Sequence, residues 1–292
     1  MFDNLKPIHC YFIIIIAGLI LFFNTLENEF VFDDESVVQN NLSIQTLSTI
    51  PDYFTAEDGF HKVIGRYYRP IVSTTYNIDY ALWELDPWGF HLTNILIHII
   101  ACLILFALLQ ELFKRKKYGL IGSLIGTLVF LVHPIHTEAV SWVSGRTDSM
   151  VTIFFFASFL FYVRYYKARE SKKQADREDA GRMLVWALIL YFIGLLSKEM
   201  IITMPVILIL FDFLFRGKSW NYLKNNMKAY GWFFAVSGFY FLLRAWLLSD
   251  IPERESYLYF KDMDFDTVIA TMVRTIPVYF KLLFAPVGLL YH

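Results

Sequence analysis

Three acidic residues, Asp33, Asp34 and Glu35, stand side by side in the stretch FVFDDESVVQNN, directly after a long apolar run. A carboxylate can take the proton of a hydroxyl group and so act as a general base. The alternative is structural, because Asp is favoured at the residue that caps the N-terminus of a helix. Capping needs one acid and three are present, so the stretch favours a role in chemistry.

Three basic residues elsewhere in the chain have the chemistry to bind a phosphate group. Arg69 lies in YYRP, Arg146 in SGRTD and Lys198 in SKE. Guanidinium groups match phosphate oxygens, and cations stabilise the charge that develops on a leaving phosphate. Each has a simpler reading: Arg69 as an anchor at the membrane interface, Arg146 in a local turn with Asp148, and Lys198 neutralised by Glu199.

The stretch HPIHTEAVSWVSGRTD contains His133, His136 and Glu138, which are residue types that bind metals. Pro134 separates the histidines and removes the spacing that an HExxH site needs, so no metal and no cofactor is expected, with a divalent metal as the alternative. Hydrogen bonding to a sugar or an acceptor is the favoured interpretation. It extends to these residues: Glu35, His133, His136, Glu138, Asp148 and Glu199.

The chain has 292 residues, of which 57% are hydrophobic, and a mean hydropathy of +0.46. This composition is too apolar for a soluble domain. The 26 basic and 27 acidic residues nearly balance, which argues against nucleic-acid binding driven by bulk charge. No phosphate loop, GxGxxG or GxSxG motif occurs, so the nucleotide chemistry of soluble enzymes is not supported.

Long apolar runs predict an all-α polytopic membrane protein with seven or eight spans, because about 20 apolar residues cross a bilayer as a helix. The runs are 8–26, 91–113, 149–166, 201–215 and 230–248, with shorter ones at 119–133 and 183–196 and a mixed one at 268–290. The first is interpreted as a retained signal anchor, since no small-residue cleavage site follows it. We expect residues 1–292 to form one transmembrane domain that is incomplete at its C-terminus.

Basic residues predict the side of the membrane on which each connection lies. With the N-terminus in the cytoplasm, the inner segments carry 16 of the 26 basic residues and the outer segments carry 7, as the positive-inside rule requires. The outer segments are 27–90, 134–149, 197–200 and 249–266. The first is expected to hold the acidic motif and an amphipathic helix on the lipid surface. The candidate residues thus converge on one periplasmic or lumenal face.

Four separated motifs, in order along nearly the whole chain, resemble a known family. They are FVFDDESVVQNN, YYRPIVSTTYNIDYALWELDPWGFHLTNILIH, HPIHTEAVSWVSGRTD and LLSKEMIITMPVILILFDF. They are similar to the membrane region of the transmembrane and tetratricopeptide-repeat O-mannosyltransferases and their bacterial relatives, in the GT-C superfamily of membrane glycosyltransferases. The resemblance implies a GT-C-like helical bundle. It also implies transfer of a mannose-like sugar from a polyprenyl or dolichyl phosphate to a protein Ser or Thr hydroxyl.

For such a transfer we expect an inverting displacement in which a carboxylate of the first outer segment is the base. Asp34 is favoured, because Asp34 and Glu35 match the Asp-Glu pair that follows the first span in this superfamily, and Asp33 is the close competitor. Arg69, Arg146 and Lys198 would bind the donor phosphate. The alternatives are transfer to a lipid or an envelope glycan, and a non-enzymatic transporter of anionic lipids.

Overall fold

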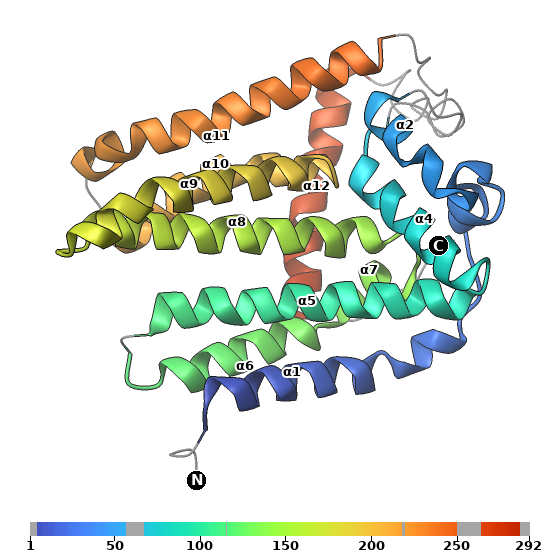
Figure 1. Ribbon diagram of the computed structural model, residues 1–292, viewed down its shortest axis with the longest axis horizontal. Helices are drawn as coiled ribbons and strands as arrows, with labels where there is room; N and C mark the ends of the chain where they lie inside the picture. The colour runs from blue at the N-terminus through green and yellow to red at the C-terminus, as the bar shows by residue number, and fades with distance from the viewer. Residues whose placement is uncertain (1–4, 57–66, 115, 218–219, 250–263, 287–292) are drawn as a thin grey trace.

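The computed structural model describes residues 5–56, 67–114, 116–217, 220–249 and 264–286 (Figure 1). These residues form helices and connecting segments and contain no strand. The α-helices are α1 (Pro7–Leu21), α2 (Ile50–Thr55), α4 (Pro70–Trp83), α5 (Pro87–Phe113), α6 (Gly119–Leu131), α7 (Thr137–Ser141), α8 (Arg146–Glu170), α9 (Gln174–Leu195), α10 (Met204–Phe211), α11 (Trp220–Leu247) and α12 (Phe265–Phe284). The 3₁₀ segments are η1 (Phe23–Glu27), η3 (Leu42–Gln45), η4 (Leu47–Thr49), η5 (Pro134–His136) and η6 (Glu199–Thr203), and the π segments are η2 (Glu35–Gln39) and η7 (Asp212–Gly217).

The long helices lie side by side in a bundle. Helix α5 packs against α1, α6 and α8, and α9 packs between α8 and α11 (Figure 1). Several of them, such as PIHCYFIIIIAGLIL in α1, are apolar around their whole circumference, which is typical of helices that face protein on one side and lipid on the other. Aromatic side chains such as Tyr162, Tyr191 and Phe233 fill the core between α8, α9 and α11.

Successive helices of the bundle run in opposite directions, so their connections gather at its two ends. Segments 22–56, 67–86, 132–145 and 196–203 all lie at one end, on the right in Figure 1. The turns that join α5 to α6 and α8 to α9 lie at the other end. The first end carries all the candidate residues of the sequence, and we call it the loop end.

Three helices among the described residues are long and apolar enough to cross a membrane: α5, α8 and α12. A fourth span results if α6 and the segment Pro134–Ser141, bent by 51° against each other, are counted together. The expected run 201–215 is instead divided among η6, α10 and η7, with Pro205 at the start of α10 lacking the N–H that a continuous helix needs. The all-helical architecture is confirmed, whereas seven or eight spans stay a prediction.

The first outer segment, in which an amphipathic helix on the lipid surface stays a prediction, is built from several short elements. It contains the short turns η3 and η4, the six-residue α2 and, beyond residues 57–66, the longer α4. The Asn77 side chain of α4 donates hydrogen bonds to the carbonyl oxygens of Ser43 (3.0 Å) and Thr46 (2.7 Å). These contacts tie the turns to α4, against which they pack. Residues 57–66, and 250–263 of the last outer segment, lie outside the described residues.

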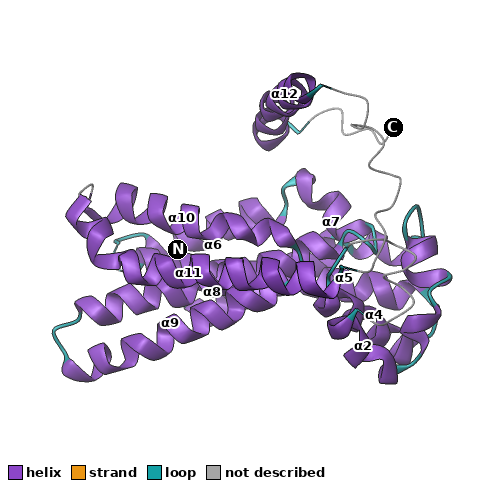
Figure 2. Ribbon diagram, turned by 90° about the horizontal axis from the view of Figure 1, so that it is seen from above, coloured by secondary structure: helices purple, strands orange, loops and turns teal. Residues whose placement is uncertain are grey.

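Helix α12 stands apart from the other helices in Figure 2. None of its residues is buried. The His133 Nε2 atom lies 2.9 Å from the carbonyl oxygen of Leu283 in this helix. It covers most of the expected run 268–290, of which 287–290 lie outside the described residues.

Candidate functional site at the loop end

A cavity of about 340 Å³ at the loop end brings together residues from four distant segments. We call it the charged pocket. Its lining includes five residues that the sequence singled out: Asp33, Arg69, Glu138, Asp148 and Lys198. Their convergence follows from the antiparallel bundle, which returns the chain to the same end before each of these segments.

Each of the two cations in the charged pocket is held by a carboxylate. The Arg69 Nε atom lies 3.4 Å from Glu199 Oε2, and the Lys198 Nζ atom lies 2.5 Å from Asp148 Oδ1. Lys198 and Glu199 are therefore paired with other residues and do not form the mutual pair that was the simpler expectation. Because each cation is oriented before any ligand binds, less ordering is needed to bind an anion there.

Glu199 stays charged in this arrangement. Burial raises the pKa of its carboxyl group, but the nearby guanidinium of Arg69, with smaller contributions from a backbone N–H and Arg244, outweighs this effect. The resulting pKa lies below the usual value of 4.5. The negative charge that orients Arg69 is thus maintained at neutral pH.

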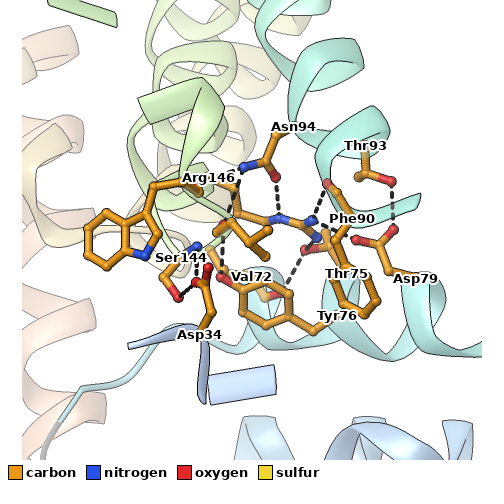
Figure 3. A network of polar contacts seen from close by, with 12 residues as sticks. Asp34, Val72, Thr75, Tyr76, Asp79, Phe90, Thr93, Asn94, Ser144 and Arg146 are labelled. Carbon is orange, nitrogen blue, oxygen red and sulfur yellow. Dashed lines mark hydrogen bonds and ion pairs between the residues drawn. The ribbon is translucent and has the colours of Figure 1, made fainter. Parts of the chain in front are cut away.

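Asp34 is completely buried, whereas its neighbour Asp33 is exposed. The Asp34 carboxylate accepts hydrogen bonds from the Ser144 backbone N–H (2.8 Å) and the Ser144 hydroxyl (2.5 Å) (Figure 3). It also accepts one from the Val31 N–H (3.1 Å). It precedes η2 but makes no capping hydrogen bond to that segment. Asp34 therefore joins the acidic stretch to the segment after α7, and it is Asp33 that lines the pocket.

Arg146 is also completely buried and does not line the charged pocket. Its guanidinium forms an ion pair with Asp79 (Nη2 to Oδ2, 2.6 Å) and donates to Asn94 Oδ1 (2.8 Å) and Thr75 Oγ1 (3.1 Å) (Figure 3). Arg146 and Asp148 both lie in the first turn of α8, where the expected local turn would be, and Asp148 pairs with Lys198. Arg146 joins the start of α8 to α4 and α5.

Asn94 is a residue that the sequence analysis missed. Its side-chain amide donates to the carbonyl oxygens of Val140, Trp142 and Val143, at 2.8–3.3 Å, while its own oxygen accepts from Arg146. These bonds hold the backbone between α7 and α8 against α5. The sequence does place this uncharged polar residue inside a long apolar run. Such a residue is expected to form hydrogen bonds, because an unpaired polar group at membrane depth is costly.

A second cavity of about 440 Å³ adjoins the charged pocket. We call it the aromatic pocket. Its lining residues are Asn28, Val31, Phe32, Asp33, Thr137, Glu138, Ser141 and Trp142. Three of them, Asp33, Glu138 and Trp142, also line the charged pocket, so the two cavities meet at a pair of carboxylates and an indole ring.

The other candidate residues lie outside both pockets. The His133 Nδ1 atom accepts from the Ile135 N–H, and the His136 ring packs 4.3 Å from the ring of Phe130. Glu35 accepts a long hydrogen bond of 3.4 Å from Asn40. In the part of the chain that the structure describes, no group of three His, Cys, Asp or Glu side chains is arranged to hold a metal ion.

Proteins related in sequence bear a common name. The chain is 31% identical over 231 residues to protein O-mannosyl-transferase TMTC4 of Mus musculus, and 32% identical over 241 residues to the TMTC4 protein of Homo sapiens. These alignments cover 73% and 77% of the chain. Protein O-mannosyl-transferase TMTC3 of Homo sapiens is 33% identical over 210 residues, which is 68% of the chain.

The chain covers 30% and 32% of the two TMTC4 proteins and 21% of TMTC3, so it spans between about a fifth and a third of the length of these relatives. No protein-family model matches the chain, and no solved structure does. The apolar helices and these relatives identify a membrane protein. The family resemblance of the four motifs is thereby confirmed: the chain is homologous to the part of the TMTC protein O-mannosyl-transferases that it matches.

Proposed function

We propose that the chain transfers a mannose-like sugar from a polyprenyl or dolichyl phosphate to a Ser or Thr hydroxyl of a protein. One observation carries the proposal: an accessible carboxylate, Asp33, lies in the same cavity as Arg69 and Lys198. The homologous proteins are named protein O-mannosyl-transferases, which supports the same reaction class. The loop end would then face the periplasm or the lumen.

The donor phosphate would bind to Arg69 and Lys198. The planar guanidinium can contact two phosphate oxygens, and the ammonium adds a second positive charge. As the bond between the anomeric carbon and the phosphate oxygen breaks, the electron pair stays with the phosphate. Both cations stabilise the charge that develops there, so the scheme requires no metal ion.

Asp33 would act as the general base in place of Asp34. The acceptor oxygen attacks the anomeric carbon from the face opposite the phosphate, and its proton passes to the Asp33 carboxylate. The sugar configuration is inverted by this single displacement. Asp34 is unsuited to this step because both of its oxygens already accept hydrogen bonds and none of its surface is exposed.

Besides Asp33, Arg69 and Lys198, two residues predicted from the sequence are included in the proposed site. Glu138 and Asp148 line the charged pocket and are proposed to contact the sugar or the acceptor. Arg146 is not proposed as a phosphate ligand, because its guanidinium is buried against Asp79. Its proposed role is to position the start of α8. His133, His136 and Glu35 line neither cavity and are not included.

The test is sugar transfer from a radiolabelled polyprenyl-phosphate mannose by the full chain in liposomes, comparing Asp33→Asn with Asp34→Asn. We expect Asp33→Asn to lower kcat by about 10²-fold or more, which is the usual contribution of a general base, without changing the unfolding temperature. Asp34→Asn should lower the unfolding temperature, because an amide cannot accept all three hydrogen bonds. Full transfer by Asp33→Asn would show that this residue is not the base.

A third variant tests the phosphate site separately. Arg69→Gln removes one of the two cations and should raise the KM for the donor, while the KM for the acceptor stays the same. A matched control is Arg182→Gln, which changes an exposed arginine at the other end of the bundle. An unchanged donor KM in Arg69→Gln would contradict the phosphate assignment.

A further inference from the structure

We propose that the aromatic pocket is the acceptor site, that it takes a hydroxyl-bearing polypeptide segment, and that it discriminates against acidic residues beside the hydroxyl. This inference rests on the proposed transfer reaction and names the residues that would choose its acceptor. Three features of the two cavities support it: their charges, the residues that line the aromatic pocket, and the junction between the cavities.

The charges of the two cavities differ in a way that assigns the two substrates. The charged pocket contains the cations Arg69 and Lys198 beside the carboxylates of Asp33, Glu138 and Asp148, whereas the eight described residues that line the aromatic pocket include two carboxylates and no basic residue. Its ionisable residues are Asp33 and Glu138. Because like charges repel and opposite charges attract, an anionic lipid phosphate is directed to the charged pocket, and a neutral or basic substrate to the aromatic pocket.

The lining of the aromatic pocket combines an apolar wall with hydrogen-bonding groups, as a polypeptide requires. The Trp142 indole N–H donates to the Val31 carbonyl oxygen (3.2 Å), and the Phe32 ring lies edge-on to the indole with centroids 6.5 Å apart. Asn28, Thr137 and Ser141 supply polar side chains beside this wall. Apolar side chains of an acceptor can pack on the rings while its amides bond to the polar groups.

Phe32 has a backbone conformation that side chains rarely adopt. Its φ angle is 53°, and its side chain is 74% exposed although it is large and apolar. A non-glycine residue in this conformation persists only where its surroundings hold it, and such residues concentrate at ligand-binding sites. The strained backbone directs the ring to the surface of the pocket and places Asp33 directly after it.

The junction of the cavities explains how the two substrates would meet. Asp33 and Glu138 line both cavities, so a hydroxyl entering from the aromatic pocket reaches the proposed base at the border of the charged pocket. The acceptor and the donor thus approach Asp33 from different sides. The same two carboxylates lie beside the path of the residues next to the acceptor hydroxyl. They would repel an acidic residue there, which is why we expect discrimination against acidic acceptors.

The experiment uses the full chain in liposomes with a radiolabelled polyprenyl-phosphate mannose and two peptides that differ only in Lys or Glu beside a Thr. We expect kcat/KM to be about 5-fold or more higher for the Lys peptide at low salt, and the ratio to shrink as salt screens the charges. Glu138→Gln should reduce the ratio. Equal use of the two peptides, or a preference for the Glu peptide, would overturn the inference.

The apolar wall is tested with Phe32→Gly, which removes the ring and suits the positive φ angle, so that the acidic stretch keeps its conformation. It should raise the KM for the peptide several-fold and leave the KM for the donor unchanged, while Arg69→Gln does the reverse. A higher donor KM in Phe32→Gly, or an unchanged peptide KM, would contradict the assignment of the cavities.

The outcomes separate this inference from the function on which it rests. If the wild-type chain transfers sugar to no acceptor at all, the proposed function fails. If it transfers sugar to both peptides equally well, the proposed function holds and the inference about the aromatic pocket is wrong. Transfer to a neutral glycan or a lipid and to neither peptide would contradict the protein acceptor on which both rest. Transfer to the peptides with the predicted charge preference supports both.

Discussion

Asp33 and Asp34 are adjacent in the chain and have opposite environments. The Asp34 carboxylate lies inside the protein with hydrogen bonds from Ser144 and Val31, and Asp33 is exposed to the cavities. Carboxylates placed in different surroundings take different chemical roles. At this scale, one aspartate fixes the position of the loop and leaves its neighbour available to act on a substrate.

The buried pair of Arg146 and Asp79 provides a prediction about stability. Arg146→Met leaves the Asp79 carboxylate buried without its cation, and breaking a buried pair in this way costs about 3–5 kcal/mol. We expect a correspondingly lower free energy of unfolding in detergent, measured by denaturant titration. The double variant Arg146→Met, Asp79→Leu should recover part of the loss, because it leaves no unpaired charge. A single variant as stable as the wild type would show that the pair is not important for folding.

The connection between α7 and α8 is the element on which both cavities depend. It carries Trp142 and Ser144, and Asn94 of α5 holds its backbone. Gly145 ends this connection where the chain passes close to itself: a Cβ atom there would lie 2.4 Å from the carbonyl oxygen of Glu138 and 3.1 Å from that of Trp142. A backbone atom cannot move away as a flexible side chain does, so the connection requires glycine for space.

Gly145→Ala should therefore displace this connection and lower sugar transfer by about 10-fold or more, since small displacements of positioned groups cost much of the rate. The control is Gly122→Ala in α6, where an added Cβ meets no atom within 4 Å. Transfer rates and unfolding temperatures of the two variants, measured side by side, check the prediction. Equal activity in both would mean that the connection adapts freely.

The whole molecule separates its candidate site from the basic turns. The charged and aromatic pockets lie at the loop end, and the turn that joins α8 to α9, with Lys172 and Lys173, lies at the opposite end (Figure 1). If the bundle spans the membrane as its basic residues indicate, these ends are on opposite sides.

Cysteine labelling can test this orientation with little background, because both natural cysteines, Cys10 and Cys102, are buried. We expect an impermeant maleimide to label Ser48→Cys, at an exposed position of the loop end, in intact spheroplasts or in vesicles with the lumenal face outward. Lys172→Cys should react only after permeabilisation. Labelling of both variants from the same side would contradict the proposed topology and with it the placement of the site.

Apolar runs predicted most of the long helices, because hydropathy and length are local properties that a short stretch of sequence displays. α5 and α8 coincide closely with the runs 91–113 and 149–166. Helix α4 was not predicted from the sequence, because PIVSTTYNIDYALW mixes polar and apolar residues without forming an apolar run. Several of its polar residues are buried because they bond to other segments. Its Asn77 and Asp79 bond to Ser43 and Arg146, which are distant in the chain.

The sequence by itself determined the residue types of the site and their family. Acidic, basic and aromatic residues at the ends of apolar runs, together with four ordered motifs, were sufficient for both. Only the tertiary structure decided which of them face a cavity. Asp34 is buried by Ser144, 110 residues away, and Arg146 by Asp79 and Asn94. The candidate residues that line a cavity are Asp33, Arg69, Glu138, Asp148 and Lys198. Burial and pairing arise from contacts between distant segments, and those contacts exist only once the bundle has folded.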